Sequence, residues 1–341
     1  MKWITAAACL IASMASGGCS AFRQDKTDAL VRCPGERKYR PAVKVSSIAG
    51  DLWEYAVLSL NVYEGEWSMA ANGKAYLPPI SAPAVHLAQV RPEACAGTKG
   101  RLPLPGWSRW EDFPSEDVRT QAAGVGLYLE VWEKTSSKTF AVAFRGTDFK
   151  SWPDWLSNLR WFRIARFFPK TEDQYIVISR KVAQEVLDRL AARPEALADP
   201  DLKITATGHS LGGGLAQFFA YALPAESSKG QPAPRVRTVR AFDPSPVTGW
   251  SSVRDHEQRA RNAEALFTHR VFEHGELLAY IRLIQSYINP PSAKNPAIQE
   301  TRVNFVVSPN IVSSHSMRVI ACGLVNAAGV GHISSPPLPP L

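Results

Sequence analysis

The apolar positions of this 341-residue chain follow two different periods along its second half. Segments that alternate or are apolar throughout are typical of strands, whereas apolar residues three and four positions apart are typical of helices. Strands are predicted over 126–132, 139–144, 202–207, 235–242, 269–273 and 303–307. Helices are predicted over 50–63, 171–192, 211–223 and 315–327. Because strands alternate with helices, we expect an α/β fold with a mainly parallel central sheet and helices on both faces.

The first part of the chain has fewer regular segments. Residues 1–19 contain an apolar run that is too short to span a bilayer and that predicts a signal peptide. Residues 20–45 are charged and irregular, and we interpret them as a tether. Residues 46–333 are then expected to form one domain, in which 64–115 supply loops and short strands. Residues 334–341 are rich in proline and predict a loose tail.

The end of the signal region suggests how the protein leaves the cytoplasm. Small residues precede Cys19, which resembles a bacterial lipoprotein signal in which Cys19 becomes the lipidated first residue. Ser16 stands where such signals usually have leucine, so ordinary cleavage nearby is the alternative. Lipidation predicts an exported lipoprotein of the cell envelope, in the outer membrane or the periplasm, and ordinary cleavage predicts a secreted protein.

Export implies an oxidising compartment, in which cysteines can pair. Cys33 and Cys95 flank the early region and could form a disulfide, although sequence alone does not fix the pairing. Cys322 lies in an apolar run and is expected to be a buried free thiol.

The composition excludes some classes of partner. Hydrophobic residues make up 45% and charged residues 21% of the chain, which is the balance of a folded globular protein. The formal charge of +8 could draw the protein to anionic lipid, but there is no dense Lys/Arg run and no nucleic-acid motif, so we expect no nucleic-acid partner. No cysteine and histidine spacing typical of a zinc site occurs, and we expect neither metal nor cofactor.

The strongest chemical signal is the segment Gly208-His209-Ser210-Leu211-Gly212, which fits the pattern Gly-x-Ser-x-Gly. A strand is predicted before it and a helix after it, so the chain must reverse sharply while presenting one side chain at the apex. Glycines two residues away on either side remove the Cβ atoms that would collide in such a turn. Ser210 would then lie at a helix N-terminus, where backbone N–H groups stabilise negative charge.

Three segments around this motif resemble the class 3 lipase family in order and spacing. They are Phe144-Arg145-Gly146-Thr147, Asp154-Trp155-Leu156-Ser157-Asn158-Leu159, and the run from Ile204 to Ala216 that includes the serine. The resemblance covers about residues 120–320. It implies an α/β-hydrolase fold and a Ser–acid–His triad that hydrolyses lipid esters through an acyl-enzyme. It also implies an oxyanion hole formed by Thr147 and by the backbone N–H of Leu211.

The histidine of this triad is expected to be His315. In α/β-hydrolases the chain order is serine, acid, histidine, so His86 comes too early. His209 is expected to point away from the site, and His332 lies in the tail. His315 lies between the last predicted strand and the terminal helix, which is where the family has its histidine.

Two carboxylates compete for the position of the acid. The segment 270–278 resembles the family segment around the catalytic aspartate, and Glu276 matches that aspartate. Asp243 ends the first strand after the serine, where the pancreatic lipase family carries its acid, although class 3 lipases have a structural turn at this place. Glu273 is a third, weaker candidate. We prefer Glu276 and keep Asp243 as the alternative.

Residues 149–170 combine aromatic and cationic side chains, which suit an interface between water and lipid. In the family a lid lies in this part of the chain, so we predict a lid-like insertion. The sequence as a whole therefore predicts a lipase or carboxylesterase that acts on a lipid or ester substrate at a membrane surface. A phospholipase A1 is the alternative within enzymes, and a non-catalytic envelope lipoprotein that keeps the fold is the alternative from another class.

Overall fold

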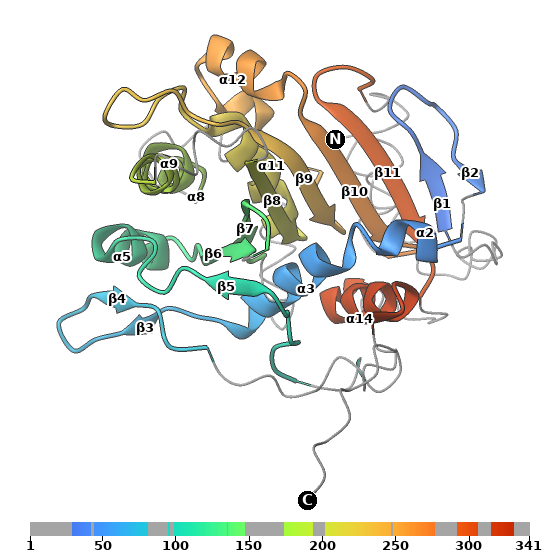
Figure 1. Ribbon diagram of the computed structural model, residues 1–341, viewed down its shortest axis with the longest axis horizontal. Helices are drawn as coiled ribbons and strands as arrows, with labels where there is room; N and C mark the ends of the chain where they lie inside the picture. Colours follow the sequence, from blue (N-terminus) through green and yellow to red (C-terminus); the bar gives the residue numbers. More distant parts are fainter. Residues whose placement is uncertain are drawn as a thin grey trace, which may run out of the picture.

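The fold is built around one large sheet (Figure 1). The computed structural model describes residues 29–41, 44–80, 95, 99–134, 136–146, 174–193, 202–246, 248–276, 292–305 and 315–330. The strands are β1 (Ala29–Arg32), β2 (Arg40–Pro41), β5 (Trp107–Arg109), β6 (Leu129–Lys134), β7 (Thr139–Phe144), β8 (Lys203–His209), β9 (Val236–Phe242), β10 (Phe267–Glu273) and β11 (Ala297–Val303). Within the described residues they form a nine-stranded sheet in the order β2-β1-β11-β10-β9-β8-β7-β6-β5. A separate small hairpin joins β3 (Ser68–Met69) to β4 (Ala75–Tyr76).

The centre of the sheet is parallel and its flanks are antiparallel. Strands β7, β8, β9, β10 and β11 pair in parallel. Strands β5 and β6 on one side, and β1 and β2 on the other, pair antiparallel. The carboxyl ends of the parallel strands therefore meet at one edge of the sheet, where α/β folds place their sites.

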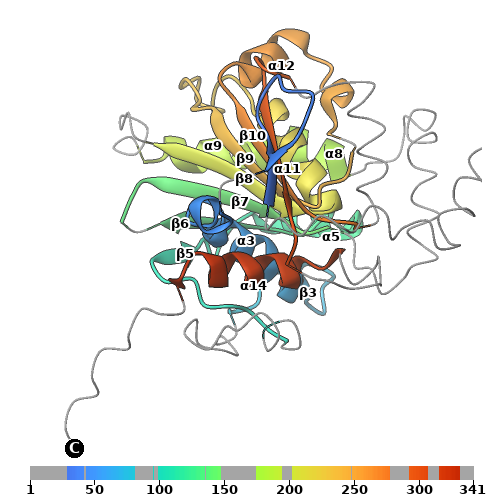
Figure 2. The same ribbon diagram turned by 90° about the vertical axis from the view of Figure 1, so that its right-hand side faces the viewer.

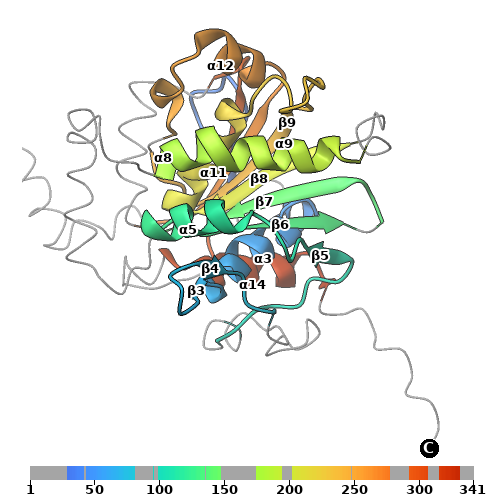
Figure 3. The ribbon, with the colours of Figure 1, turned by 90° about the vertical axis from the view of Figure 1, so that its left-hand side faces the viewer.

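Helices cover both faces of the sheet (Figures 2 and 3). One face packs against α5 (Glu116–Gly124), α8 (Gln174–Val177), the π-helical turn η4 (Ile178–Val182), α9 (Ala183–Ala191), α11 (Leu211–Ala222) and α12 (His256–Ala263). The other face packs against α2 (Ser46–Ala49), α3 (Trp53–Asn61) and α14 (Met317–Ala327), while the short 3-10 turns are η2 (Val62–Glu64) and η5 (Trp250–Ser252). The predicted fold class, an α/β-hydrolase arrangement with a mainly parallel sheet, is confirmed. None of the helices in the described part of the chain is long and apolar enough to cross a membrane.

Two predicted boundaries differ from the structure at the β1 side of the sheet. Residues 29–41 belong to the region interpreted as a tether, yet they contribute β1 and β2 to the sheet. The strand predicted over 303–307 is instead β11, which ends at Val303. Strand β11 contains polar residues, so the pattern of hydrophobic positions does not predict it. These polar residues can be buried because they are paired, as Glu300 is with Arg32 and Tyr39.

The predicted pairing of the cysteines is wrong, because Cys95 pairs with Cys322 and not with Cys33. Cys322 is buried, as predicted, but it forms a disulfide with Cys95, and the two Cα atoms are 6.0 Å apart. Cys33 is a free cysteine. The pairing joins α14 to the chain before residues 99–102, which the apolar run around Cys322 could not reveal.

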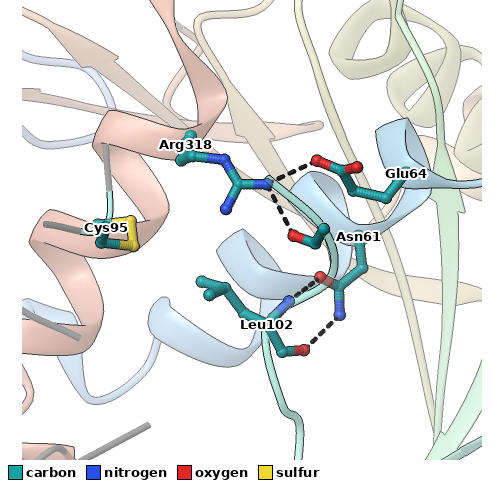
Figure 4. The surroundings of a disulfide bond; sticks show 7 residues. Asn61, Glu64, Cys95, Leu102 and Arg318 are labelled. Carbon is teal, nitrogen blue, oxygen red and sulfur yellow. Dashed lines mark hydrogen bonds and ion pairs between the residues drawn. A yellow bond between two sulfur atoms is a disulfide. The ribbon is translucent and has the colours of Figure 1, made fainter. Parts of the chain in front are cut away.

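Hydrogen bonds hold the same segment beside the disulfide (Figure 4). The Asn61 amide donates to the Leu102 carbonyl and accepts from its N–H, both at 2.8 Å. Arg318, on α14, donates to the carboxylate of Glu64 and to the carbonyl of Gly100. The segment around residues 100–102 is thus held against α3 and α14 by hydrogen bonds.

Candidate active site

Ser210 stands at the apex of the turn between β8 and α11. Its backbone has φ 57° and ψ −124°, a region that non-glycine residues rarely adopt. The turn is fixed by hydrogen bonds: the Ser210 N–H donates to the carbonyl of Phe242, and the Ser245 N–H donates to the carbonyl of Ser210, both at 2.9 Å. A Cβ on Gly208 or Gly212 would collide with backbone atoms of the neighbouring turn and strand, which explains the two flanking glycines.

The first turn of α11 lies directly after this serine. The N–H groups of Gly213 and Gly214 donate to the Ser210 carbonyl at 3.0 and 3.3 Å. Leu211, the predicted donor to the oxyanion, is the first residue of the helix. Ser210 is 2% exposed, so the serine lies in a site that largely excludes water.

His315 lies just before α14 and reaches the carboxyl edge of the sheet. Its Nδ1 atom is 2.6 Å from Oε2 of Glu276 and 3.7 Å from Oδ2 of Asp243. Glu276 follows β10 after Gly275, whose φ of 74° makes the turn that brings the carboxylate back. All three side chains are buried. The contact with Glu276 is a hydrogen bond, whereas the distance to Asp243 is too long for one.

Asp243 directly follows β9 and is held by the neighbouring strand. Its Oδ1 accepts from the N–H of Glu273 at 2.9 Å, and its own N–H donates to the carbonyl of Val271 at 2.7 Å. Its φ is 39°, so the residue is fixed in a strained conformation at the strand end. Glu273, the third candidate acid, thus contributes its backbone to the position of Asp243.

His209 does not point away from this cluster as expected. Its ring centroid is 4.7 Å from that of His315, and its Nε2 is 3.7 Å from Oδ2 of Asp243. Side chains alternate along a strand, and His209 shares the face of Thr205 and Thr207, which is the face of α3 and α14. The prediction considered the neighbouring serine and overlooked this alternation.

Tyr63 is a member of the site that the sequence did not indicate. Its hydroxyl is 2.9 Å from Nδ1 of His209, and it also donates to the His209 carbonyl at 3.3 Å. Tyr63 comes from η2, about 146 positions before its partner, and a lone tyrosine in an unmatched region gives no signal. It anchors the histidine that lies beside His315.

One set of donors in this cluster has the chemistry of a metal site. The ligand atoms of His209, Asp243 and His315 all lie within 4.8 Å of one another. Imidazole and carboxylate groups suit transition metals. The Nδ1 atom of His315, which lies 3.7 Å from Asp243, is already in contact with Glu276.

Several predicted site residues lie outside the described residues: Thr147, the aromatic and cationic segment 149–170, and Cys19. The residues before Thr147 are described. Arg145 donates to the Gly65 carbonyl at 2.8 Å and lies over the ring of Tyr128, so it supports the loop. A Cβ on Gly146 would collide with the Tyr63 hydroxyl and the backbone of the serine turn. The end of β7 therefore packs against that turn.

Part of the chain matches a known protein family. Residues 141–275 match the family "Lipase (class 3)". The predicted resemblance to class 3 lipases is confirmed. The matched segment contains Ser210 and Asp243, and it ends one residue before Glu276. This match supports a hydrolase of lipid esters.

Two solved lipase structures are also similar to the chain. A fungal lipase–inhibitor complex, described as a model for interfacial activation, is 16% identical, with a TM-score of 0.43 over 86% of this chain and 99% of that one. The Lip2 lipase from Yarrowia lipolytica is 14% identical, with a TM-score of 0.35 over 79% of this chain and 92% of that one. None of the curated proteins matches the chain.

Proposed function

We propose that the protein hydrolyses lipid esters with Ser210 as nucleophile, His315 as general base and Glu276 as the acid that orients it. The observation that carries this proposal is the 2.6 Å contact between Nδ1 of His315 and Glu276, at the sheet edge where the serine turn lies. A carboxylate on Nδ1 fixes the tautomer of the imidazole and leaves Nε2 to take a proton.

The reaction then proceeds in two halves. The Ser210 hydroxyl attacks the acyl carbonyl while His315 takes its proton, and the same proton leaves with the alcohol as the C–O bond breaks. Water attacks the acyl-enzyme in the second half, gives its proton to His315 and releases the carboxylic acid, while the serine regains its hydrogen. The backbone N–H of Leu211 and Thr147 would stabilise the oxyanion, each worth about 3 kcal/mol of barrier. This mechanism needs no cofactor.

Glu276 is preferred to Asp243 because of its distance from the imidazole. A hydrogen bond to Nδ1 requires a separation of about 3 Å, which Glu276 meets and Asp243, at 3.7 Å, does not. Asp243 instead lies equally far from His209 and His315. We assign it to positioning the two imidazoles rather than to the triad.

We propose a lipid ester as the substrate and the cell envelope as the location of the protein. The lipase family match favours a lipid ester, and the formal charge of +8 favours an anionic surface, which keeps phospholipase A1 as a second candidate. Comparing the turnover of triacylglycerol with that of phospholipid separates the two. We also propose export to the cell envelope with Cys19 as the lipidated residue, on the basis of the N-terminal sequence.

A fluorophosphonate probe tests the nucleophile directly. We expect the wild-type protein to be labelled and to hydrolyse a short-chain p-nitrophenyl ester, and we expect S210A to lose both. Removal of a triad serine costs roughly a million-fold in kcat. S252A, which changes an exposed serine on η5, is the matched control and should keep both properties. Equal labelling of S210A and wild type would refute the proposal in favour of another nucleophile, and a folded wild type without labelling or turnover would favour a non-catalytic protein.

A further inference from the structure

A second cavity lies on the α3 side of the sheet, away from the serine turn. It has a volume of about 570 Å³ and is formed by the start of α3, the first parts of β8 and β9, and the end of β6. Lys203 and Thr205 of β8 line it, whereas Ser210 follows the last residue of that strand. At about 3.3 Å per residue, the cavity lies roughly 16–23 Å from Ser210 along the strand. It is therefore separate from the proposed active site.

The charges that line this cavity are mainly positive. Four cations, Lys134, Lys203, Arg237 and Arg240, face two carboxylates, those of Asp51 and Glu54. Lys134 is already neutralised, because its ammonium donates to both carboxylate oxygens of Glu54 at 2.7 and 2.8 Å.

The other three cations lack such a partner. Across the described residues, no carboxylate lies within ion-pair distance of Lys203, Arg237 or Arg240. Asp51 is exposed to solvent. The cavity thus holds three cations that form no ion pair with an acidic side chain of the described residues.

Arg240 is the unusual member of this group because it is half-buried. Its Nη1 is 3.1 Å from Nδ1 of His269, its Nε is buried without a hydrogen-bond partner, and its guanidinium lies over the ring of Phe267. His269 does not compensate the charge, because burial and the nearby guanidinium lower the pKa of His269 to about 3 and keep it neutral. Burial lowers the pKa of Arg240, and the charge of the exposed Asp51 offsets this only in part. An anion in the cavity would therefore stabilise the guanidinium.

We propose that this cavity binds a soluble ligand that carries a phosphate group. A guanidinium presents two donors that match phosphate oxygens, and Lys203 and Arg237 add charge at the rim. Thr205 and Thr238 also line the cavity, and a threonine hydroxyl can donate a hydrogen bond to a phosphate oxygen. A soluble ligand is favoured over a lipid headgroup because a bilayer that presents an ester to the serine turn would lie at the opposite end of the strands. This choice between the two sources rests on the proposed function, whereas phosphate binding in the cavity does not depend on the chemistry of Ser210.

Binding of glycerol 3-phosphate and of inorganic phosphate to the full-length protein, measured by calorimetry and thermal shift, tests this site. Sodium chloride at matched ionic strength controls for screening. We expect phosphate and glycerol 3-phosphate, but not chloride, to bind and to raise the Tm. K203Q/R237Q changes two exposed or rim side chains, should fold normally, and should weaken binding about tenfold, which corresponds to about 1.4 kcal/mol. R240Q should weaken it further.

K229Q/R254Q is the matched control, because it removes two exposed cations outside the cavity and should leave binding unchanged. Equal responses of K203Q/R237Q and K229Q/R254Q would overturn the proposal, as would equal effects of phosphate and chloride. A third outcome would contradict the soluble ligand: the protein binds vesicles of anionic phospholipid, K203Q/R237Q weakens that binding, and neither soluble phosphate binds. The cavity would then be assigned to a lipid headgroup.

Discussion

Two buried carboxylates in this protein have very different surroundings. Glu130, on β6, accepts hydrogen bonds from the guanidiniums of Arg101 and Arg109, the hydroxyl of Tyr128 and the indole N–H of Trp132. Glu276, after β10, contacts an imidazole at 2.6 Å. Neither side chain is exposed.

The difference separates a carboxylate that holds the fold from one that can do chemistry. Burial by itself would raise the pKa of Glu130, but the hydrogen bonds and charge of Arg101, with the charge of Arg109, hold that pKa below its ordinary value. Its charge is therefore permanent at neutral pH and is matched by cations that do not titrate. The partner of Glu276 is an imidazole, which can gain and lose a proton near neutral pH. A buried acid beside a titratable base is the arrangement that acid–base catalysis requires.

Of the changes that test this comparison, Glu276→Gln has the largest expected effect. An amide of the same size keeps the packing but loses the charge that fixes the imidazole tautomer. We expect kcat for a short-chain ester to fall by roughly a thousand- to ten-thousand-fold, while the free energy of unfolding stays close to that of wild type. Asp243→Asn is the matched control and should lose about tenfold, which its longer distance from His315 predicts. A larger loss for Asp243→Asn than for Glu276→Gln would reverse our assignment of the acid.

Glu130→Gln should affect stability rather than turnover. The change leaves Arg101 and Arg109 buried without their counter-charge, which costs about 3–5 kcal/mol of unfolding free energy. Urea denaturation measures this loss, and kcat of the folded fraction should remain within about twofold of wild type. If Glu130→Gln instead reduced kcat without reducing stability, the distinction between the two carboxylates would fail.

Much of the fold could be predicted from hydrophobic period alone. The strand predicted over 139–144 has the same bounds in the structure, because all its side chains are buried. The helix predicted over 211–223 ends at Ala222 in the structure. The missed parts are held by polar contacts. Strand β11 contains the half-buried Gln299 and the buried Glu300, whose partners lie far away in the sequence. A local pattern cannot register such pairing.

The candidate site divides in the same way. Ser210 could be predicted because a local motif encodes the turn, and His315 because chain order and the family resemblance indicate it. The choice between Glu276 and Asp243 depends on a difference of about 1 Å in distance to the imidazole, which no sequence pattern contains. The role of Tyr63 and the orientation of His209 could not be predicted, because both depend on how α3 and the turn after it pack against the sheet.

The disulfide offers a further test of the structural region. Cys95 and Cys322 hold the chain next to residues 99–102, which include Arg101 of the Glu130 cluster. The double variant C95S/C322S should lose about 2–4 kcal/mol of unfolding free energy. Added reductant should lower the Tm of wild type but not of this variant. Because Cys322 lies within α14, seven positions after His315, kcat of the folded variant should be unchanged. A loss of turnover larger than the loss of stability would show that the two regions are coupled.

The smallest expected effect comes from another buried imidazole, that of His269, and it extends the comparison from acids to bases. His269 lies beside Arg240 and bonds with Thr301, and its pKa is lowered from 6.5 to about 3 by burial first and by the charge of Arg240 second. Below pH 6.5 the unfolded chain therefore binds a proton that the folded protein does not bind. Stability falls as the pH decreases from about 6.5 to about 3, by about 2 kcal/mol at pH 5. The variant H269Q cannot take up that proton and should lose about 2 kcal/mol less than wild type between pH 7 and pH 5, as measured by urea denaturation. If wild type and H269Q instead lost the same unfolding free energy between pH 7 and pH 5, His269 would take up its proton in the folded protein. The charge beside a buried imidazole, cation or carboxylate, would then not decide whether the imidazole can be protonated.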